Sequence, residues 1–265
     1  MLDDVYKSMD QGEMTGIVCL DLTKAFDMMD HGILEKKLIR YFGNGPASKL
    51  LGDYLQRRTQ QVKIGNVISN SREVMYGVPQ GSILGPLLFQ LYINDLPEIV
   101  GKRKTLMFAD DTTLYYSSRL PLEIQTILNS DLSAVKGWLD MNRLLLNADK
   151  TTFMIVRGRN TNDQNISIEI CNQRVKEVDV ARVLGVKIDA RLTYEPHIRN
   201  LITKTKYKYR AFARVSKYLN KDMKVLLYNS TIASHLNYCD MVYETGNKGM
   251  RDILLKPRTH ALGPQ

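Results

Sequence analysis

Two adjacent carboxylates interrupt an apolar stretch and restrict how this part of the chain can fold. The largely apolar stretches 106–109 (LMFA) and 113–116 (TLYY) flank Asp110 and Asp111. Two short apolar arms around a polar pair are typical of a β-hairpin with the pair at its tip. Unpaired negative charge beside apolar strands is costly to bury, so a cation is expected to hold it. A plain polar turn is the alternative, because Asp is a common turn residue.

A third carboxylate, Asp21, ends an earlier apolar run. Residues 16–22 are short and rich in β-branched side chains, which predicts a buried strand, and residues 24–41 continue with the spacing of a helix. Hard oxygen donors suit Mg²⁺, and two such ions roughly 3.5–4 Å apart support in-line displacement at phosphorus. Asp21, Asp110 and Asp111 are therefore the candidate catalytic and metal-binding residues, for nucleotidyl transfer or phosphodiester cleavage.

The other predicted elements place strands early and helices late. Hairpin arms are predicted at 61–65 and 67–75, helices at 83–96, at 121–143 and from Glu195 onward, and strands at 153–156, 166–170 and 183–188. This order predicts an α+β fold followed by a helical module.

The segment Gly77–Pro86, GVPQGSILGP, combines turn-forming glycines with an amide side chain just before an apolar helix. One interpretation is a loop in which Ser82 caps the helix. The other is a loop whose glycines let a base pair approach while Gln80 touches the template or the incoming nucleotide. The pattern alone favours neither.

The positive charge of the chain is concentrated in one stretch. Lys and Arg outnumber Asp and Glu by 37 to 28, and residues 199–224 hold nine basic residues and one acidic residue, or +8 of the net +9. Such a stretch is either a solvated helix face or a surface that follows a phosphate backbone. Tyr207, Tyr209 and Tyr218 lie among these charges and either stack on bases or pack, and packing is the expectation for Tyr209.

Cysteine usage and the beginning of the sequence indicate an intracellular protein. The three cysteines are far apart and odd in number, which predicts neither a disulfide framework nor a zinc site. The first residues are polar and acidic, so neither a signal peptide nor a membrane anchor is expected there, and the expected location is the cytoplasm or nucleus.

Four segments in order carry a resemblance to a known family. Residues 20–27 (LDLTKAFD), 77–86 (GVPQGSILGP), 108–111 (FADD) and 147–151 (NADKT) resemble the A, B, C and D motifs of reverse transcriptases of LINE-type (non-LTR) retrotransposons. The resemblance implies the core of an RNA-directed DNA polymerase. Its expected partners are an RNA template, a DNA primer and deoxynucleoside triphosphates, and its expected cofactor is two Mg²⁺ ions, with Mn²⁺ as a substitute.

The resemblance also implies roles for individual residues. Asp21 and Asp110 would hold the metals with Asp111 assisting, Phe26 would exclude a ribose 2′-hydroxyl, Gln80 and Gly81 would position template and nucleotide, and Lys150 would lie near the departing pyrophosphate. Nucleic acid would be bound by Lys204, Lys206, Lys208, Arg210 and Arg214. Taken alone, Phe26 is equally well a core residue and Lys150 a solvated charge.

The domain organisation expected from the resemblance is a polymerase right hand. Residues 1–190 would form the palm, with an antiparallel sheet and packed helices, and 191–245 a basic, thumb-like helical module, while 246–265 is an atypical tail. Only about twenty residues precede Asp21, so most of the fingers are expected to be missing. The alternative function is a catalytically inactive retrotransposon remnant that only binds nucleic acid. A palm-type nucleotidyltransferase or cyclase is a third option, which the Gly77–Pro86 segment disfavours.

Overall fold

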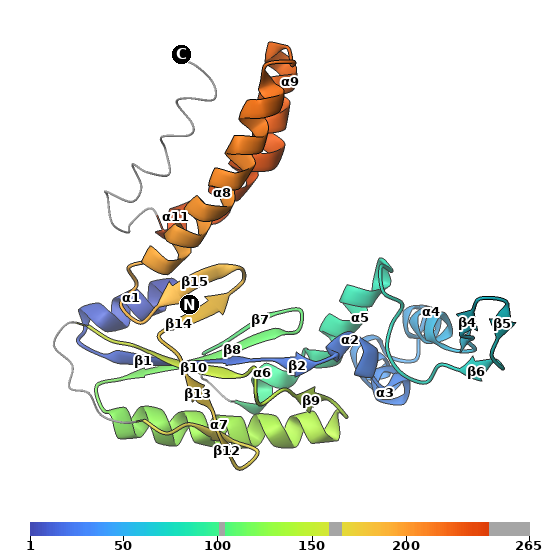
Figure 1. The fold of residues 1–265 in the computed structure, drawn as a ribbon. Coiled ribbons are helices and arrows are strands. Elements are labelled where there is room, and N and C mark those ends of the chain that lie inside the picture. Colours follow the sequence, from blue (N-terminus) through green and yellow to red (C-terminus); the bar gives the residue numbers. More distant parts are fainter. Residues whose placement is uncertain (101–103, 159–165, 244–265) are drawn as a thin grey trace. The chain divides into compact units, whose positions relative to one another are not determined.

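The computed structural model describes residues 1–100, 104–158 and 166–243 (Figure 1). These divide into two compact units, one of residues 1–153 and 166–177 and one of residues 154–158 and 178–243. The second unit thus begins before the domain boundary expected at residue 190, and that domain assignment stays a prediction. The tail at 246–265 lies outside the described residues. Among the helices of the described residues, none is long and apolar enough to cross a membrane.

The first unit contains the elements from α1 to β13. Its helices are α1 (Leu2–Asp10), α2 (Ala25–Met28), α3 (His31–Phe42), α4 (Pro46–Leu55), α5 (Leu84–Ile93), α6 (Leu96–Ile99) and α7 (Pro121–Met141). Its strands are β1 (Met14–Leu20), β2 (Leu22–Thr23), β3 (Thr59–Gln60), β4 (Lys63–Ile64), β5 (Val67–Ile68), β6 (Arg72–Glu73), β7 (Lys104–Phe108), β8 (Asp111–Ser118), β9 (Leu145–Leu146), β11 (Glu169–Ile170), β12 (Gln173–Arg174) and β13 (Lys176–Glu177), while β10 (Thr152–Val156) continues into the second unit.

The second unit contains the elements from β14 onward. They are β14 (Val180–Val183), β15 (Val186–Asp189), α8 (Glu195–Ser216), α9 (Lys221–Tyr228), the π-helix η1 (Asn229–Ala233), α10 (Ser234–Leu236) and α11 (Asp240–Tyr243).

A five-stranded sheet in the order β13-β10-β1-β8-β7 organises the first unit. β1 and β8 run antiparallel, and so do β7 and β8, which pair up to Phe108 and Asp111. This pairing leaves Ala109 and Asp110 as a two-residue turn, in which Ala109 has the positive φ of 51° that tight hairpin turns require. The predicted hairpin is therefore confirmed, with its two carboxylates at the tip.

The long helix α7 covers one face of this sheet (Figure 1). Its apolar residues recur every three or four positions, as predicted, so one stripe of the helix is buried. At the contact, a Cβ on Gly16 of β1 would lie only 2.6 Å from Cγ2 of Ile124 and 2.8 Å from Cδ1 of Leu128. Glycine at this position therefore lets the helix approach the strand that ends at Asp21.

The segment after β1 differs from the single helix predicted for residues 24–41. It forms two helices, α2 and α3, because the backbone is extended at Met29 (ψ 116°) and at Asp30 (ψ 122°). The Asp30 side chain accepts a hydrogen bond from the backbone N–H of Ile33 at 2.9 Å and so caps α3. This cap begins a new helix where the apolar spacing suggested a continuous one.

Between α4 and α5 the chain forms the predicted hairpin around Gly65 and Asn66. Next to the turn, Ile64 of β4 pairs with Val67 of β5. Farther from the turn, Thr59 of β3 pairs with Glu73 of β6. The side chains of these four short strands are exposed. The helix predicted at 83–96 forms as α5, with α6 following it as a separate turn, and the helix predicted at 121–143 forms as α7.

In the second unit, the strand predicted at 183–188 is a hairpin. Val183 pairs with Val186, and the two residues between them, Leu184 and Gly185, have φ values of 46° and 85°. Two consecutive residues with positive φ are typical of a tight β-turn, which the apolar run concealed. The hydroxyl of Tyr238 donates a hydrogen bond to the carbonyl of Leu184 at 2.7 Å and supports this turn.

The helices of the second unit share a small aromatic core. Phe212, Tyr228 and Ile232 are buried together, and the half-buried Tyr209 packs against them. Packing is therefore confirmed for Tyr209. Tyr207 and Tyr218, in contrast, are 68% and 78% exposed.

A loss of stability at mildly acidic pH is expected for the second unit. The His197 ring is buried, and its Nδ1 accepts a hydrogen bond from the backbone N–H of Lys187 at 3.2 Å. Burial lowers the pKa of His197, and the charges of Lys187 and Lys204 lower it further. The neutral ring therefore stabilises the fold fully above the unfolded-state pKa of about 6.5, and this contribution is lost as the pH falls below that value.

We expect the free energy of unfolding to be lower at pH 5.5 than at pH 7.5, with a smaller difference in His197→Gln. The free energy of unfolding is measured by urea denaturation at both pH values, with circular dichroism as the signal. His235→Gln is the comparison variant: burial and the nearby Lys208 and Lys204 also lower the pKa of that ring, but it is less buried, so its removal is expected to reduce the pH dependence by less than His197→Gln does. An undiminished pH dependence in His197→Gln would contradict the expectation.

Candidate active site

The three predicted carboxylates lie at one end of the main sheet. Leu20 of β1 pairs with Thr112 of β8, so the next residues along the two strands are Asp21 and Asp111. Asp110 precedes Asp111 in the turn that joins β7 to β8. Asp21 and Asp110 are half-buried and Asp111 is exposed. Strand pairing thus brings Asp21 to the same end of the sheet as Asp110 and Asp111, which lie about ninety residues later in the sequence.

The charge of Asp111 acts on the strand beside it. Burial raises the pKa of the Cys19 thiol, and the Asp111 carboxylate contributes to the rise. Cys19 lies two residues before Asp21 and pairs with Thr113.

The loop that contains Lys150 is attached to the backbone of Asp21. The Asn147 N–H donates to the Asp21 carbonyl at 2.8 Å, and the Asp21 N–H donates to Oγ1 of Thr151 at 3.4 Å. Next to them, β2 pairs with β9 through Leu22 and Leu146. Lys150 itself is exposed, and its backbone N–H donates to Asn147. The loop is therefore held beside Asp21 through its backbone.

The Gly77–Gly81 loop is hydrogen-bonded to the segment that follows Asp21. The N–H of Gly77 donates to the carbonyl of Met29 at 2.8 Å, and the N–H of Val78 donates to the carbonyl of Phe26 at 3.1 Å. The carbonyl of Gly77 in turn accepts a hydrogen bond from Nε2 of His31 at 2.7 Å. A carbonyl can only accept, so His31 carries its proton on Nε2.

Residues at the end of this loop come close to α2. Nε2 of Gln80 donates to Oδ1 of Asp27 at 3.4 Å, and Gly81 has a φ of 77°. The Phe26 ring lies against the Phe89 ring of α5, with 4.5 Å between the ring centroids. Phe26 is thus fixed by packing and remains half-buried beside the loop that contains Gln80.

The same loop also caps the helix that follows it. Oγ of Ser82 accepts a hydrogen bond from the Gly85 N–H at 2.9 Å, near the beginning of α5. The N-cap residue of α5 is Ile83 rather than the predicted Ser82, but the Ser82 hydroxyl one residue earlier still accepts a hydrogen bond from the first turn, and this contact is compatible with those of Gln80.

A partly buried polar network supports the turn between α2 and α3. Arg143 donates to Oδ2 of Asp30 at 2.6 Å, and the N–H of Asp30 donates to the hydroxyl of Tyr92 at 3.3 Å. That hydroxyl donates to the carbonyl of Asn142 at 2.6 Å. Burial raises the pKa of Tyr92 to about 12, so the hydroxyl keeps its proton at neutral pH. The network joins α3, α5 and α7 behind the candidate site.

The sequence prediction missed His31, Asp30 and Arg143. A lone histidine at a helix start and an arginine after a helix end look like ordinary surface residues. The one signal available was Asp30, an N-cap residue three positions before Ile33.

The carboxylates suit a hard divalent cation when substrate completes its coordination. Asp21, Asp110 and Asp111 offer the oxygen donors that Mg²⁺ prefers. Within residues 1–100, 104–158 and 166–243, no group of three or more His, Cys, Asp or Glu side chains is arranged to hold a metal ion. Mg²⁺ is commonly held by one or two carboxylates together with waters and substrate phosphates. Metal binding by Asp21, Asp110 and Asp111 therefore stays a prediction, in which waters and substrate phosphates would complete the coordination of the ion.

The predicted nucleic-acid-binding residues all lie on α8, in the second unit. Lys204, Lys206, Arg210 and Arg214 are exposed, whereas Lys208 is half-buried and its Nζ contacts Nε2 of His235. Four of these five side chains are therefore on the surface. Tyr207, on the same helix, is exposed among them.

The family of the chain is shown by a family model and by curated relatives. The model described as "Reverse transcriptase (RNA-dependent DNA polymerase)" matches residues 2–188. The chain is 31% identical over 202 residues to "Probable RNA-directed DNA polymerase from transposon BS" of Drosophila melanogaster, with 74% of this chain and 22% of that protein covered. It is 28% identical over 251 residues to the probable RNA-directed DNA polymerase from transposon X-element of the same species, with 90% and 27% covered. The chain spans about a quarter of the length of these relatives.

Solved structures show the same fold. Apo telomerase from Candida tropicalis has a TM-score of 0.53 at 8% identity, covering 98% of this chain and 48% of that one. A truncated form of it has a TM-score of 0.52 at 12% identity, covering 71% and 36%. At such identities the likeness concerns the fold alone, and it confirms the α+β polymerase right hand. The chain belongs to the reverse transcriptase (RNA-dependent DNA polymerase) family and is a reverse transcriptase domain of the LINE-type (non-LTR) retrotransposon class.

Proposed function

We propose that this chain is the core of an RNA-directed DNA polymerase that extends a DNA primer along an RNA template. One observation carries the proposal: three separate segments converge on the stretch from Asp21 to Met29. The Asp110–Asp111 hairpin reaches it through β1, the Lys150 loop through the Asp21 backbone, and the Gly77–Gly81 loop through Phe26 and Met29. A polymerase needs its carboxylates, its nucleotide-contacting loop and its leaving-group residue at one place.

In this proposal Asp21 and Asp110 bind two divalent ions, with Asp111 assisting. The ions are Mg²⁺, with Mn²⁺ as a substitute, and when bound they would activate the attacking oxygen and stabilise the leaving one. The family generally uses divalent metal ions. The protein contributes carboxylates at the end of a rigid, paired strand, so little reorganisation is needed when substrate arrives.

The neighbouring residues select and orient the nucleotide. Phe26, which Phe89 holds in place, excludes a ribose 2′-hydroxyl, and Gln80 and Gly81 position template and nucleotide. Lys150 interacts with the departing pyrophosphate. The positions of these residues beside Asp21 support the roles, because reacting groups must be held in a narrow range of geometry.

The proposed partners are an RNA template, a DNA primer and deoxynucleoside triphosphates. The basic residues of α8 bind the phosphate backbone: Lys204, Lys206, Lys208, Arg210 and Arg214. Their affinity is expected to fall with added salt, because binding releases counterions from the nucleic acid.

Primer extension with and without the hairpin carboxylates tests the proposal. The wild-type chain and Asp110→Ala/Asp111→Ala are supplied with an RNA template, a DNA primer, deoxynucleotides and Mg²⁺. The matched control is Asp10→Ala/Asp53→Ala, which removes two exposed carboxylates away from the sheet end. We expect extension by the wild type and the control and none by the site variant. Salt-sensitive template binding without any wild-type extension would contradict the proposal and favour an inactive remnant that only binds nucleic acid.

A further inference from the structure

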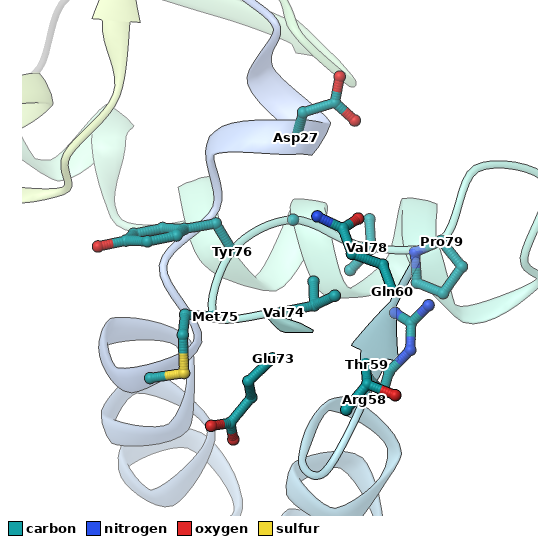
Figure 2. Close-up of a pocket in the computed structure, with 11 residues that line it drawn as sticks. Asp27, Arg58, Thr59, Gln60, Glu73, Val74, Met75, Tyr76, Val78 and Pro79 are labelled. Atoms are coloured by element: carbon teal, nitrogen blue, oxygen red, sulfur yellow. The ribbon is translucent and has the colours of Figure 1, made fainter. Parts of the chain in front are cut away.

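A cavity of about 480 Å³ lies behind the Gly77–Gly81 loop (Figure 2). One wall is the β3–β6 ladder with Arg58, Thr59 and Gln60, and the other is the backbone of residues 77–79. Its size is within the range of small-molecule sites, which is roughly 300–1,000 Å³. The cavity is thus large enough for a nucleotide or for one residue of a nucleic acid strand.

The backbone around Arg58 is fixed. Arg57 has a positive φ of 56°, which turns the chain out of α4. The carbonyl of Arg58 accepts a hydrogen bond from the Val74 N–H at 2.8 Å, and Thr59 then pairs with Glu73. The Arg58 side chain therefore starts from a paired strand rather than from a mobile loop.

The guanidinium of Arg58 has no anionic partner within the described part of the chain. Arg58 is half-buried, and no hydrogen bond or ion pair joins its side chain to another described residue. Glu73 is exposed, and in Figure 2 its carboxylate points away from the Arg58 guanidinium, which lies near Gln60 and Pro79. An arginine stays charged at any physiological pH, so a half-buried one favours a bound anion.

The surroundings of this guanidinium suit a phosphate. Arginine presents a planar fork of donors that matches two phosphate oxygens, and the Thr59 hydroxyl and the Gln60 amide are further donors in the lining. Asp27 also lines the cavity but lies at the far side of the loop in Figure 2. Its negative charge would repel an anion there and favour the Arg58 end.

We infer that the Arg58 end of this cavity binds a phosphate group of a nucleic acid strand or of a nucleotide. The site is separate from the carboxylates of the sheet end and adjoins the loop whose Gln80 is proposed to contact template and nucleotide. Phosphate binding by Arg58 does not depend on the proposed function; only the assignment of that phosphate to a template, a primer or a nucleotide rests on it. Binding can be measured without catalysis, so failure of one proposal is distinguishable from failure of the other.

The test compares two neighbouring arginines in the full chain. Arg58→Gln removes the cavity charge, and Arg57→Gln removes an exposed charge one residue earlier. One arm measures the affinity for a labelled single-stranded RNA by fluorescence anisotropy over a range of salt. The other measures the affinity for deoxyguanosine triphosphate by calorimetry.

We expect Arg58→Gln to weaken binding about ten-fold in at least one arm, because a charge-assisted bidentate contact is lost. If the phosphate belongs to a strand, the loss appears with RNA, and the slope of log K against log salt falls by about 0.7, the value for one contact on a single strand. If it belongs to a nucleotide, the loss appears with the triphosphate. Arg57→Gln should change neither affinity by more than about two-fold.

Equal losses in the two variants, no loss in either, or no binding of either ligand by the wild type would overturn the inference. Should Arg58→Gln fail to fold, Arg58→Lys and Arg57→Lys replace the pair. Lysine keeps the charge but not the planar fork, so a loss of about three-fold is expected at position 58 alone.

Discussion

Asp21→Asn is expected to reduce the rate of nucleotide incorporation by roughly a thousand-fold or more while leaving the fold intact. The change removes one charge and keeps the size of the side chain. A thousand-fold corresponds to about 4 kcal/mol of transition-state stabilisation, the order that a metal-binding carboxylate supplies. Single-turnover primer extension at saturating nucleotide measures the rate.

The same variant should unfold with nearly wild-type stability. Asp21 is half-buried, and its attachments to Asn147 and Thr151 are made by its backbone, which asparagine preserves. The free energy of unfolding is therefore expected to change by less than about 1 kcal/mol. Asp53→Asn, at an exposed position on α4, is the matched control for loss of one negative charge. If Asp21→Asn kept more than a tenth of the wild-type rate, Asp21 would not be a metal-binding residue.

Gly77→Ala should destabilise the protein by about 2–4 kcal/mol, and Gly81→Ala by only about 1 kcal/mol. Both glycines have similar positive φ values, 75° and 77°, so alanine is strained at either. A Cβ on Gly77, however, would lie 2.8 Å from the carbonyl oxygen and 2.9 Å from Cα of Asp27, whereas one on Gly81 meets nothing within 4 Å. Backbone atoms cannot move aside cheaply, which adds about 1–3 kcal/mol for Gly77.

Urea denaturation of the two alanine variants measures this difference, because the shared backbone strain cancels in the comparison. An equal loss of stability in Gly77→Ala and Gly81→Ala would contradict the close contact between the Gly77–Gly81 loop and α2. Hydrogen exchange of the Gly77 N–H, which is bonded to Met29, gives a local measurement of the same contact.

The elements that sequence analysis predicted well are those whose pattern is local. The hairpin around Asp110 has two apolar arms and a tight turn, and α7 has an apolar stripe over its whole length, so neither depends on distant residues. The grouping of Asp21 with Asp110 and Asp111 was different. It required the pairing of β1 with β8, which no local pattern shows; carboxylate chemistry suggested the grouping, and the resemblance to a family supported it.

The failures have physical causes that are equally specific. Residues 24–41 have helical apolar spacing throughout, but Asp30 is held by Arg143, far away in the sequence, and begins a second helix. In residues 183–188, an apolar run hides the turn at Leu184 and Gly185, because two short strands and one longer strand have the same composition. Nothing in the sequence distinguishes Arg58 from its neighbour Arg57. Only the pairing of β3 with β6 shows that the two side chains have different surroundings.

The way the chain alternates between the two compact units limits how such a protein can be taken apart. It enters the second unit at Met154, has returned to the first by Ile166, and enters the second again at Val178. Neither unit is one continuous stretch of sequence, so no single cut separates them into complete halves. A fusion at the first crossing, between Phe153 and Met154, would cut the strand β10 in two, whereas one at Val178 would leave residues 154–158 with the wrong unit. Chimaeras are therefore expected to fold only when residues 154–177 come from the same parent as the segments before and after them.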